Sequence, residues 1–369
     1  MKLLFIFGTR PEAIKMAPLI LNARRDSFFD VRVCVTGQHR EMLRQVLDFF
    51  AIKPDHNLDI MSFNQSLFGL TAGILGALKD VLEGETPDLV LVQGDTSTAM
   101  AGALGAFYLG MPVAHIEAGL RSHDMYSPFP EEINRVLVGH IARLHFAPTA
   151  RAAENLAREG IDQKNIHVVG NTVIDALLLA LEKIKSRDED FKGAFPWLDE
   201  DRRMILVTGH RRESFGEPFR DICLALREIA ANHKLEMVYP VHLNPNVRDP
   251  VFDILKYCKN IHLTDPLSYP QLIWLMEKSY LVLTDSGGIQ EEAPSLGKPV
   301  LVMREVTERV EGIEAGTCKL VGTSKQSIVA ETERLLTGRA EYERMSKSAN
   351  PYGDGNSSER ILDIIRTLR

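Results

Sequence analysis

Near the start of the chain, the apolar run Leu3-Leu4-Phe5-Ile6-Phe7 is followed at once by Gly8-Thr9-Arg10-Pro11-Glu12-Ala13-Ile14-Lys15. The run predicts a buried β-strand, because strands of a parallel sheet that is covered on both faces read as short continuous apolar stretches. Pro11 suits the first position of a helix, which we expect to extend to about residue 25. A strand, a polar loop and a helix in this order are typical of an α/β fold.

The same order of strand, loop and helix recurs along the chain. Further strands are predicted at residues 31–36, 88–93, 112–116, 204–208, 236–241, 280–284 and 299–303. The rhythm restarts after Gly170-Asn171-Thr172, and 369 residues suit two domains of ordinary size. We therefore predict two Rossmann-like, doubly wound α/β domains, at residues 1–168 and 171–350, that face a central cleft. In such sheets, ligands bind at the carboxyl ends of the parallel strands.

Composition and charge exclude several classes of protein. The 43 basic and 50 acidic residues are scattered along the chain, so we expect no nucleic-acid partner. The 4 cysteines stand far apart and the 11 histidines show no metal-site spacing, so we expect neither a disulfide framework nor a metal. No apolar stretch approaches the roughly 20 residues of a membrane span, and the N-terminal run lacks a cleavage site. We predict a cytoplasmic protein with no membrane partner.

Acidic side chains directly follow two of the predicted strands. Asp95 and Glu117 each come after a buried apolar run, which directs both carboxylates to the edge of the sheet where ligands bind. A buried carboxylate costs several kcal/mol unless it is paired or used, so both residues are candidates for catalysis. The alternative is a structural role, as helix N-caps or as partners of Arg121 and Arg135.

The start of one predicted helix and one further loop also carry candidate side chains. Glu131 and Glu132 lie in the first turn of a predicted helix, where the helix dipole alone would explain one of the two acids. A second loop, after the strand predicted at residues 204–208, places His210 beside Arg211 and Arg212. A structural histidine is the usual interpretation, but the neighbouring arginines favour a functional site.

Ser286-Gly287-Gly288 follows the strand predicted at residues 280–284 and opens a helix. Free backbone N–H groups and the positive end of a helix dipole suit a diphosphate. Glu292 lies one turn further along and can accept two hydrogen bonds from a ribose diol, while Arg309 supplies a nearby cation. The chain has no Gly-x-x-x-x-Gly-Lys-Ser/Thr motif, and its first loop lacks Gly-x-Gly-x-x-Gly. We therefore expect neither nucleoside triphosphate hydrolysis nor a nicotinamide cofactor.

Several of these segments together resemble the bacterial non-hydrolysing UDP-N-acetylglucosamine 2-epimerases. The matching segments are residues 8–12 (GTRPE), 93–96 (QGDT), 115–121 (HIEAGLR), 208–213 (TGHRRE), 239–245 (YPVHLNP) and 285–294 (DSGGIQEEAP). The resemblance runs nearly end to end, as far as residues 350–355. It implies a glycosyltransferase-B arrangement of two Rossmann-like domains, a homodimer, and a C-terminal helix at about residues 357–368 that crosses back to the first domain.

The resemblance also implies roles for individual residues. The substrate-binding residues are Arg10, Lys15, Asp95, Glu117, His210, Leu272, Ser286, Gly287, Gly288, Glu292 and Arg309, and the catalytic residues are Asp95, Glu117, Glu131 and His210. Gln38, Arg211 and His242 match an allosteric site for a second UDP-N-acetylglucosamine, although Asn64 stands where strongly regulated members carry Arg. Leu267, Leu272 and Val310 depart from the family, which usually has Gln, Phe and Pro there.

The reaction implied by the resemblance is a reversible epimerisation at C2 of UDP-N-acetylglucosamine to UDP-N-acetylmannosamine. It proceeds by elimination and re-addition of UDP through 2-acetamidoglucal, needs no cofactor, and supplies cell-surface polysaccharide synthesis. Three alternatives stay open at this point. They are a hydrolysing 2-epimerase that releases N-acetylmannosamine and UDP, a glycosyltransferase of the same architecture, and a non-catalytic nucleotide-sugar sensor.

Overall fold

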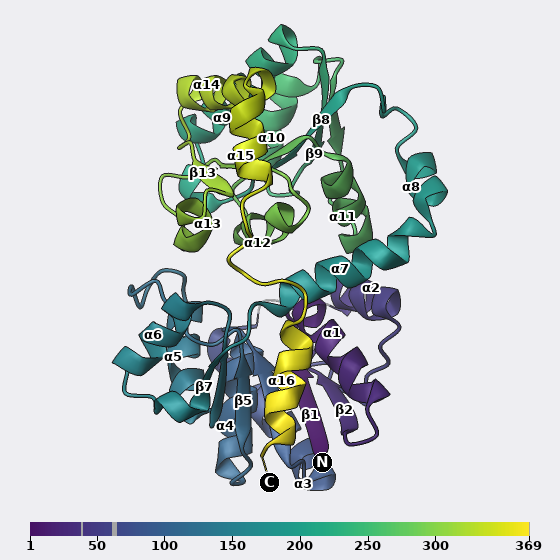
Figure 1. Cartoon of the computed structure of the whole chain (residues 1–369). Coiled ribbons are helices and arrows are strands. Elements are labelled where there is room, and N and C mark those ends of the chain that lie inside the picture. Colours follow the sequence, from purple (N-terminus) through teal and green to yellow (C-terminus); the bar gives the residue numbers. More distant parts are fainter. Residues whose placement is uncertain (38–39, 61–64, 369) are drawn as a thin grey trace. The chain divides into compact units, whose positions relative to one another are not determined.

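The computed structural model describes residues 1–37, 40–60 and 65–368, and the chain forms two compact units (Figure 1). Unit 1 consists of Met1–Ala176 together with Tyr352–Arg369, and unit 2 consists of Leu177–Pro351. Unit 2 is therefore inserted into unit 1. The first connection lies within helix α7 (Thr172–Lys185), whereas the domain ends predicted from the sequence were residues 168, 171 and 350.

Within the described residues, unit 1 contains a parallel sheet of seven strands in the order β3-β2-β1-β4-β5-β6-β7. The strands are β1 (Lys2–Phe7), β2 (Asp30–Val35), β3 (His56–Asn57), β4 (Leu89–Gln93), β5 (Val113–Ile116), β6 (Leu144–Ala147) and β7 (Ile166–Val168). Strands β1, β2, β4 and β5 were predicted. Strands β3, β6 and β7 were missed: β3 and β7 are short strands at the edges of the sheet, and β6 has only four residues.

The helices of unit 1 follow its strands in the order that the sequence predicts. They are α1 (Arg10–Arg25), α2 (Arg40–Phe50), α3 (Leu67–Glu85), α4 (Ser97–Tyr108), α5 (Glu131–Ile141), α6 (Ala150–Arg158), the short 3-10 helix η1 (Gln163–Asn165), α7 and α16 (Ser357–Arg366). Thr9 and Glu12 start α1 with a capping box, in which each side chain accepts a hydrogen bond from the backbone N–H of the other. Strand β1 is buried from Leu3 to Phe7, as a central strand covered on both faces should be.

Helix α16 (Ser357–Arg366) returns the end of the chain to unit 1. It packs against α1, and Arg366 forms an ion pair with Asp26, the residue that ends α1. The buried carboxylate of Asp175 in α7 accepts a hydrogen bond of 2.7 Å from the backbone N–H of Ser358. Burial raises the pKa of Asp175, because it disfavours the charged carboxylate. The hydrogen bonds from the first turn of α16 offset part of this cost.

Within the described residues, unit 2 contains a second parallel sheet, of six strands in the order β10-β9-β8-β11-β12-β13. The strands are β8 (Arg203–Thr208), β9 (Leu235–Pro240), β10 (Ile261–Thr264), β11 (Leu281–Thr284), β12 (Val300–Val302) and β13 (Cys318–Leu320). The edge strands β10 and β13 were not predicted, because their side chains are only partly buried and form no apolar run.

The helices of unit 2 complete the same alternation. They are α8 (Asp188–Ala194), η2 (Arg212–Ser214), α9 (Glu217–Asn232), α10 (Pro245–Leu255), α11 (Tyr269–Lys278), α12 (Gly287–Ser295), α13 (Val310–Glu314), α14 (Lys325–Thr337) and α15 (Arg339–Ser346). The predicted fold class, two α/β domains with parallel sheets, is confirmed, and how the two domains face each other stays a prediction. Across the described part of the chain, no helix is long and apolar enough to cross a membrane.

Candidate functional site

Asp95 lies in the tight connection between β4 and α4 of unit 1. Gly94 takes the left-handed backbone conformation there, with φ of +69°, and Thr96 caps α4. Two residues of α5 hold Asp95 from the side: Asn134 Nδ2 donates to its backbone carbonyl at 2.9 Å, and Arg135 forms an ion pair with its carboxylate. Arg135 is almost fully buried, so the carboxylate has a fixed cationic partner. Pairing with Arg135 was the structural alternative for Asp95, and the structure contains this ion pair.

Glu117 follows β5 and is held even more closely. Its backbone is left-handed, with φ of +63°, and its side chain is buried. The carboxylate accepts hydrogen bonds from the ammonium group of Lys15 in α1 and from the side-chain amide of Gln93 at the end of β4. The structure thus brings two predicted site residues, Lys15 and Glu117, into direct contact. Arg121, an alternative partner from the sequence, instead forms an ion pair with Glu159.

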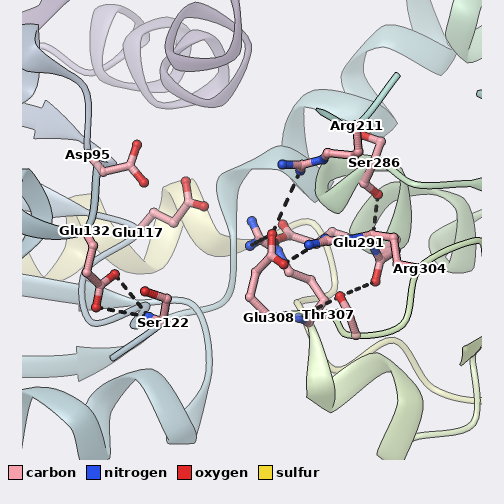
Figure 2. Close-up of polar contacts among 12 residues, drawn as sticks. Asp95, Glu117, Ser122, Glu132, Arg211, Ser286, Glu291, Arg304, Thr307 and Glu308 are labelled. Carbon is pink, nitrogen blue, oxygen red and sulfur yellow. Dashed lines mark hydrogen bonds and ion pairs between the residues drawn. The ribbon is translucent and has the colours of Figure 1, made fainter. Parts of the chain in front are cut away.

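The two acids at the start of α5 have different surroundings. Glu132 is buried and accepts a hydrogen bond of 3.1 Å from the backbone N–H of Ser122 (Figure 2). It also accepts one of 3.0 Å from the N–H of His123 and pairs with Arg135. Glu132 therefore fixes the loop that precedes α5. Glu131, the acid that the family resemblance singles out, is the first residue of α5 and is only half-buried.

Glu12 was not predicted as a site residue, but it positions two loops of unit 1. Glu12 is buried and accepts hydrogen bonds from the amide of Thr9 and from Thr96 Oγ1, both at 2.7 Å, so it ties the loop of Arg10 to the loop of Asp95. Burial raises the pKa of Glu12. The Thr-x-x-Glu spacing of a capping box was the signal that could have revealed this residue.

His115 supports the same edge of the sheet from within β5. Its ring Nε2 lies 2.7 Å from the carbonyl oxygen of Gly94, which can only accept, so Nε2 carries the proton. Complete burial lowers the pKa of His115 to about 3, and the ring is neutral at physiological pH. It therefore holds the turn before Asp95 without adding a charge.

In unit 2, the loop after β8 is anchored to Asp285 at the end of β11. The buried carboxylate oxygen Oδ2 accepts hydrogen bonds of 2.6 and 2.7 Å from the backbone N–H groups of His210 and Arg211. The ring Nδ1 of His210 lies 3.6 Å from the other oxygen, and the ring stacks on His242 at 5.4 Å. The structure thus brings together three predicted residues, His210, Arg211 and His242. Asp285 was missed as an anchor, because its two acceptor contacts depend on tertiary geometry.

Ser286 precedes α12, and Gly287 and Gly288 form its first turn. The N–H of Ser286 donates to Thr284 Oγ1 at 2.9 Å, which fixes the entry to the helix. The N–H groups of a helix's first turn have no acceptor within the helix, so they are available to an anion. Arg309 lies beside them: a Cβ atom placed on Gly287 would be only 3.3 Å from Arg309 Cζ. A helix N-terminus and a guanidinium group therefore converge on one point.

Arg309 is held by two carboxylates. Its Nε lies 2.8 Å from Glu291 Oε1, and its Nη1 lies 3.1 Å from Glu308 Oε1. Glu291 is buried in α12, and Thr307 Oγ1 accepts the backbone N–H of Arg309 at 3.1 Å. Val310 begins the short helix α13 directly after Arg309. The position of the guanidinium group is thus determined by unit 2 itself.

Helix α11 contacts Glu292 of α12 through Tyr269, and it also carries Leu272. The hydroxyl group of the buried Tyr269 in α11 donates to Glu292 Oε1 at 3.1 Å, and burial raises the pKa of this tyrosine well above its usual value. Leu272 lies in the first turn of α11, and its N–H donates to the carbonyl oxygen of Ser268 at 3.0 Å. Any contact of Leu272 with a base through its backbone therefore cannot use that N–H.

Three predicted residues remain to be placed. Arg10 is the first residue of α1 and is partly exposed. Gln38 and Asn64, which bear on the predicted allosteric site, lie outside the described residues. Searching residues 1–37, 40–60 and 65–368 finds no group of three or more His, Cys, Asp or Glu side chains that could hold a metal ion.

Comparison with known proteins gives consistent matches along the chain. Residues 22–366 match the family model for UDP-N-acetylglucosamine 2-epimerase. The chain is 55% identical over 373 aligned positions to the UDP-N-acetylglucosamine 2-epimerase of Escherichia coli strain K12, covering 100% of this chain and 99% of that protein. Identity to the Campylobacter jejuni enzyme of the same name is 53%, with 99% and 97% covered. A crystal structure of the Neisseria meningitidis enzyme bound to UDP-GlcNAc is 50% identical, with a TM-score of 0.94 and coverage of 99% and 100%.

Proposed function

Because this chain belongs to the UDP-N-acetylglucosamine 2-epimerase family, we propose that it interconverts UDP-N-acetylglucosamine and UDP-N-acetylmannosamine without hydrolysis, by elimination and re-addition of UDP. One observation carries the proposal. Asp95 and Glu117 follow the carboxyl ends of the neighbouring strands β4 and β5, and a cation holds each in position. Positioned carboxylates are what acid–base chemistry at a carbon needs. The Neisseria meningitidis relative was crystallised with UDP-GlcNAc, which supports the choice of substrate.

The chemistry explains why carboxylates and an anion site are both needed. No carbonyl group acidifies the C2 proton of an N-acetylhexosamine, so a carboxylate cannot remove it directly. Breaking the C1–O bond to UDP develops positive charge at C1, which acidifies C2–H. The proton leaves, a C1–C2 double bond forms, and the products are 2-acetamidoglucal and UDP. Re-addition of UDP at C1, with a proton delivered to the opposite face of C2, completes the inversion without a change of oxidation state.

The residues divide between these two tasks in our proposal. Asp95, Glu117 and Glu131 handle the proton at C2, and Lys15 holds the Glu117 carboxylate in place. The leaving diphosphate is stabilised by cations and by backbone N–H groups, namely Arg10, His210, Ser286, Gly287, Gly288 and Arg309. Glu292 binds the ribose, and Leu272 lies near the base. The protein supplies general acid–base groups and charge stabilisation, and it needs no cofactor for this reaction.

The wider setting of the enzyme is part of the same proposal. We propose a cytoplasmic homodimer whose product supplies cell-surface polysaccharide synthesis. Arg211 and His242, which the structure brings beside His210, would contact a second UDP-N-acetylglucosamine together with Gln38. Exclusion of water from the occupied site would protect the 2-acetamidoglucal intermediate from hydrolysis.

Turnover in D2O tests the elimination step. Incubation with UDP-N-acetylglucosamine should place deuterium at C2 of both the product and the recovered substrate, because the C2 proton is lost to a carboxylate that exchanges with solvent. Proton NMR of the reaction mixture reads both positions. Unlabelled substrate and product after turnover would rule out elimination. Accumulation of free N-acetylmannosamine and UDP as final products would instead show a hydrolysing epimerase.

Gly287→Val tests the diphosphate site in unit 2. The branched side chain would stand where the Cβ position is already 3.3 Å from Arg309 Cζ, so it would displace the guanidinium group and cover the first turn of α12. We expect UDP affinity to fall by about 10-fold or more by calorimetry. The contacts of the new side chain are flexible side chains rather than backbone, so the melting curve should stay near that of the parent.

Gly193→Val is the matched control, because a Cβ atom at Gly193 of α8 meets no atom within 4 Å. This variant carries the same change in helix propensity in the same unit and should bind UDP like the parent. Equal UDP affinity in Gly287→Val and Gly193→Val would remove the start of α12 from the site.

A further inference from the structure

A carboxylate stands at the point where unit 2 is expected to bind the diphosphate. Glu308 Oε1 lies 3.1 Å from Arg309 Nη1, and a Cβ atom placed on Gly287 would be 3.3 Å from the same oxygen. The other oxygen, Oε2, lies 2.9 Å from Nη1 of the buried Arg304. Glu308 therefore occupies the space beside the first residue of α12 and uses the guanidinium group that an incoming phosphate would need.

This carboxylate is charged whenever the site could be used. Burial alone would raise the pKa of Glu308, but the guanidinium groups of Arg309 and Arg304 hold that pKa at about 2. Protonation therefore cannot remove the negative charge at physiological pH. A diphosphate placed against Gly287 would meet a like charge at short range, so the carboxylate has to find another position when the site is filled.

A third cation, Arg211, is also within reach of Glu308. Nη2 of Arg211 lies 4.0 Å from the same oxygen, Oε1, that contacts Arg309 (Figure 2). The backbone of Arg211 is fixed through its N–H bond to Asp285, at 2.7 Å. Rotation of the Glu308 side chain alone could therefore exchange Arg309 for Arg211, without movement of either backbone segment.

The backbone around Glu308 is fixed as well. Thr307 Oγ1 donates to Gln290 Oε1 in α12 at 2.7 Å and accepts from the N–H of Arg309 at 3.1 Å. Arg304 is also held by Glu213, at 2.6 Å, so it has a second carboxylate partner if Glu308 turns away. The loop is thus built so that one side chain can change partners while its neighbours stay in place.

We propose that Glu308 is an internal counter-ion that the diphosphate of UDP displaces from Arg309 and that then pairs with Arg211. The proposal rests on the proposed function, because it assumes that UDP binds at the start of α12. It makes Glu308 a determinant of UDP affinity. It also makes Arg211 the residue that receives the displaced charge, and so it links the loop after β8 to occupation of the diphosphate site.

UDP titration of Glu308→Gln by calorimetry is the first test. The substitution keeps the size of the side chain and removes its charge, so UDP should bind about 5-fold more tightly at low salt, because the competing anion is gone. Glu305→Gln is the matched control: Glu305 is exposed on the same loop, where it accepts the N–H of Thr323 at 3.1 Å. This control should leave UDP affinity unchanged. Unchanged or weaker UDP binding by a folded Glu308→Gln variant would overturn the proposal.

A double-mutant cycle with Arg211→Met is the second test, and its first step does not depend on how Glu308→Gln folds. In the parent chain, Arg211→Met should weaken UDP binding about 3-fold or more, since the displaced carboxylate has no new partner. In the Glu308→Gln background the same substitution should have no further effect. An equal loss in both backgrounds would show that Arg211 acts independently of Glu308.

The diphosphate site at α12 and the exchange of partners by Glu308 are tested by different variants. If Gly287→Val leaves UDP binding intact, the diphosphate does not bind at the start of α12, and the proposed function loses this site. If Gly287→Val abolishes binding while Glu308→Gln does not strengthen it, the site stands and only the exchange of partners is wrong.

Discussion

We expect Asp95→Asn and Glu117→Gln each to lower turnover by about 100-fold or more, while UDP affinity stays within a few-fold of the parent. Both substitutions are nearly isosteric and leave an oxygen that can still accept from Arg135 or Lys15. What they remove is the ionised group that takes up the C2 proton or stabilises charge at C1. The expected diphosphate site lies mainly in unit 2, so UDP binding should depend little on these acids.

The contacts of both acids make a structural role the main alternative, and the experiment must separate the two. Melting curves, UDP titration and steady-state rates should be measured on each variant. Glu159→Gln is the control, because it removes the charge that pairs with the buried guanidinium group of Arg121 in the same unit. It should lower stability while the folded protein turns over normally. Loss of stability together with activity would indicate a structural role for Asp95 or Glu117. Parental melting and parental rates would show that the catalytic assignment is wrong.

The second large effect is expected from Gly119→Ala, which should lower the free energy of unfolding by roughly 4 kcal/mol. Gly119 has φ of +89°, a conformation that costs energy for any residue with a Cβ atom. Its Cβ would also lie 2.1 Å from the backbone carbonyl oxygen of Ala152 in α6, which no side-chain rotation can relieve. Urea unfolding measures the difference. Because Gly119 ends the turn that carries Glu117, turnover should fall as well.

Gly160→Ala separates the two contributions. Gly160, which follows α6, has φ of +87°, but a Cβ atom there meets nothing within 4 Å. This variant carries only the backbone strain and should lose about 1 kcal/mol. If the two variants lost the same stability, the close approach of α6 to Gly119 would contribute nothing, and the argument from contact would fail.

The sequence predicted those parts of the fold that leave a local signal. Buried central strands such as β1 and β4 appear as apolar runs, because both of their faces are covered. Most side chains of the edge strands β7, β10 and β13 are partly exposed to solvent, so these strands form no continuous apolar run. The point where the chain passes from unit 1 to unit 2 was also invisible, because it falls inside the continuous helix α7.

In the candidate site too, some residues could be predicted from the sequence and others could not. Asp95 and Glu117 could be found because an acid directly after a buried strand is unusual, and the glycines after β11 mark a helix N-terminus. Their partners could not be found, because they are set by tertiary contacts. Arg135 reaches Asp95 from α5, and Glu308 joins three arginines from two loops. Such ion pairs depend on how helices and loops pack on the sheet, so they cannot be predicted from the spacing of residues in the sequence.

The return of the chain to unit 1 has a consequence for biosynthesis. Helix α16 leaves the ribosome after all of unit 2, yet it packs against α1, which emerges before unit 2. Domains usually fold as they emerge, with the N-terminal domain first. Here all of unit 2 is synthesised before α16, which belongs to unit 1. Asp175 therefore lacks the N–H donor of Ser358 until α16 has been made. Unit 1 starts to emerge before unit 2, but it gains the contacts of α16 only after unit 2 has been made.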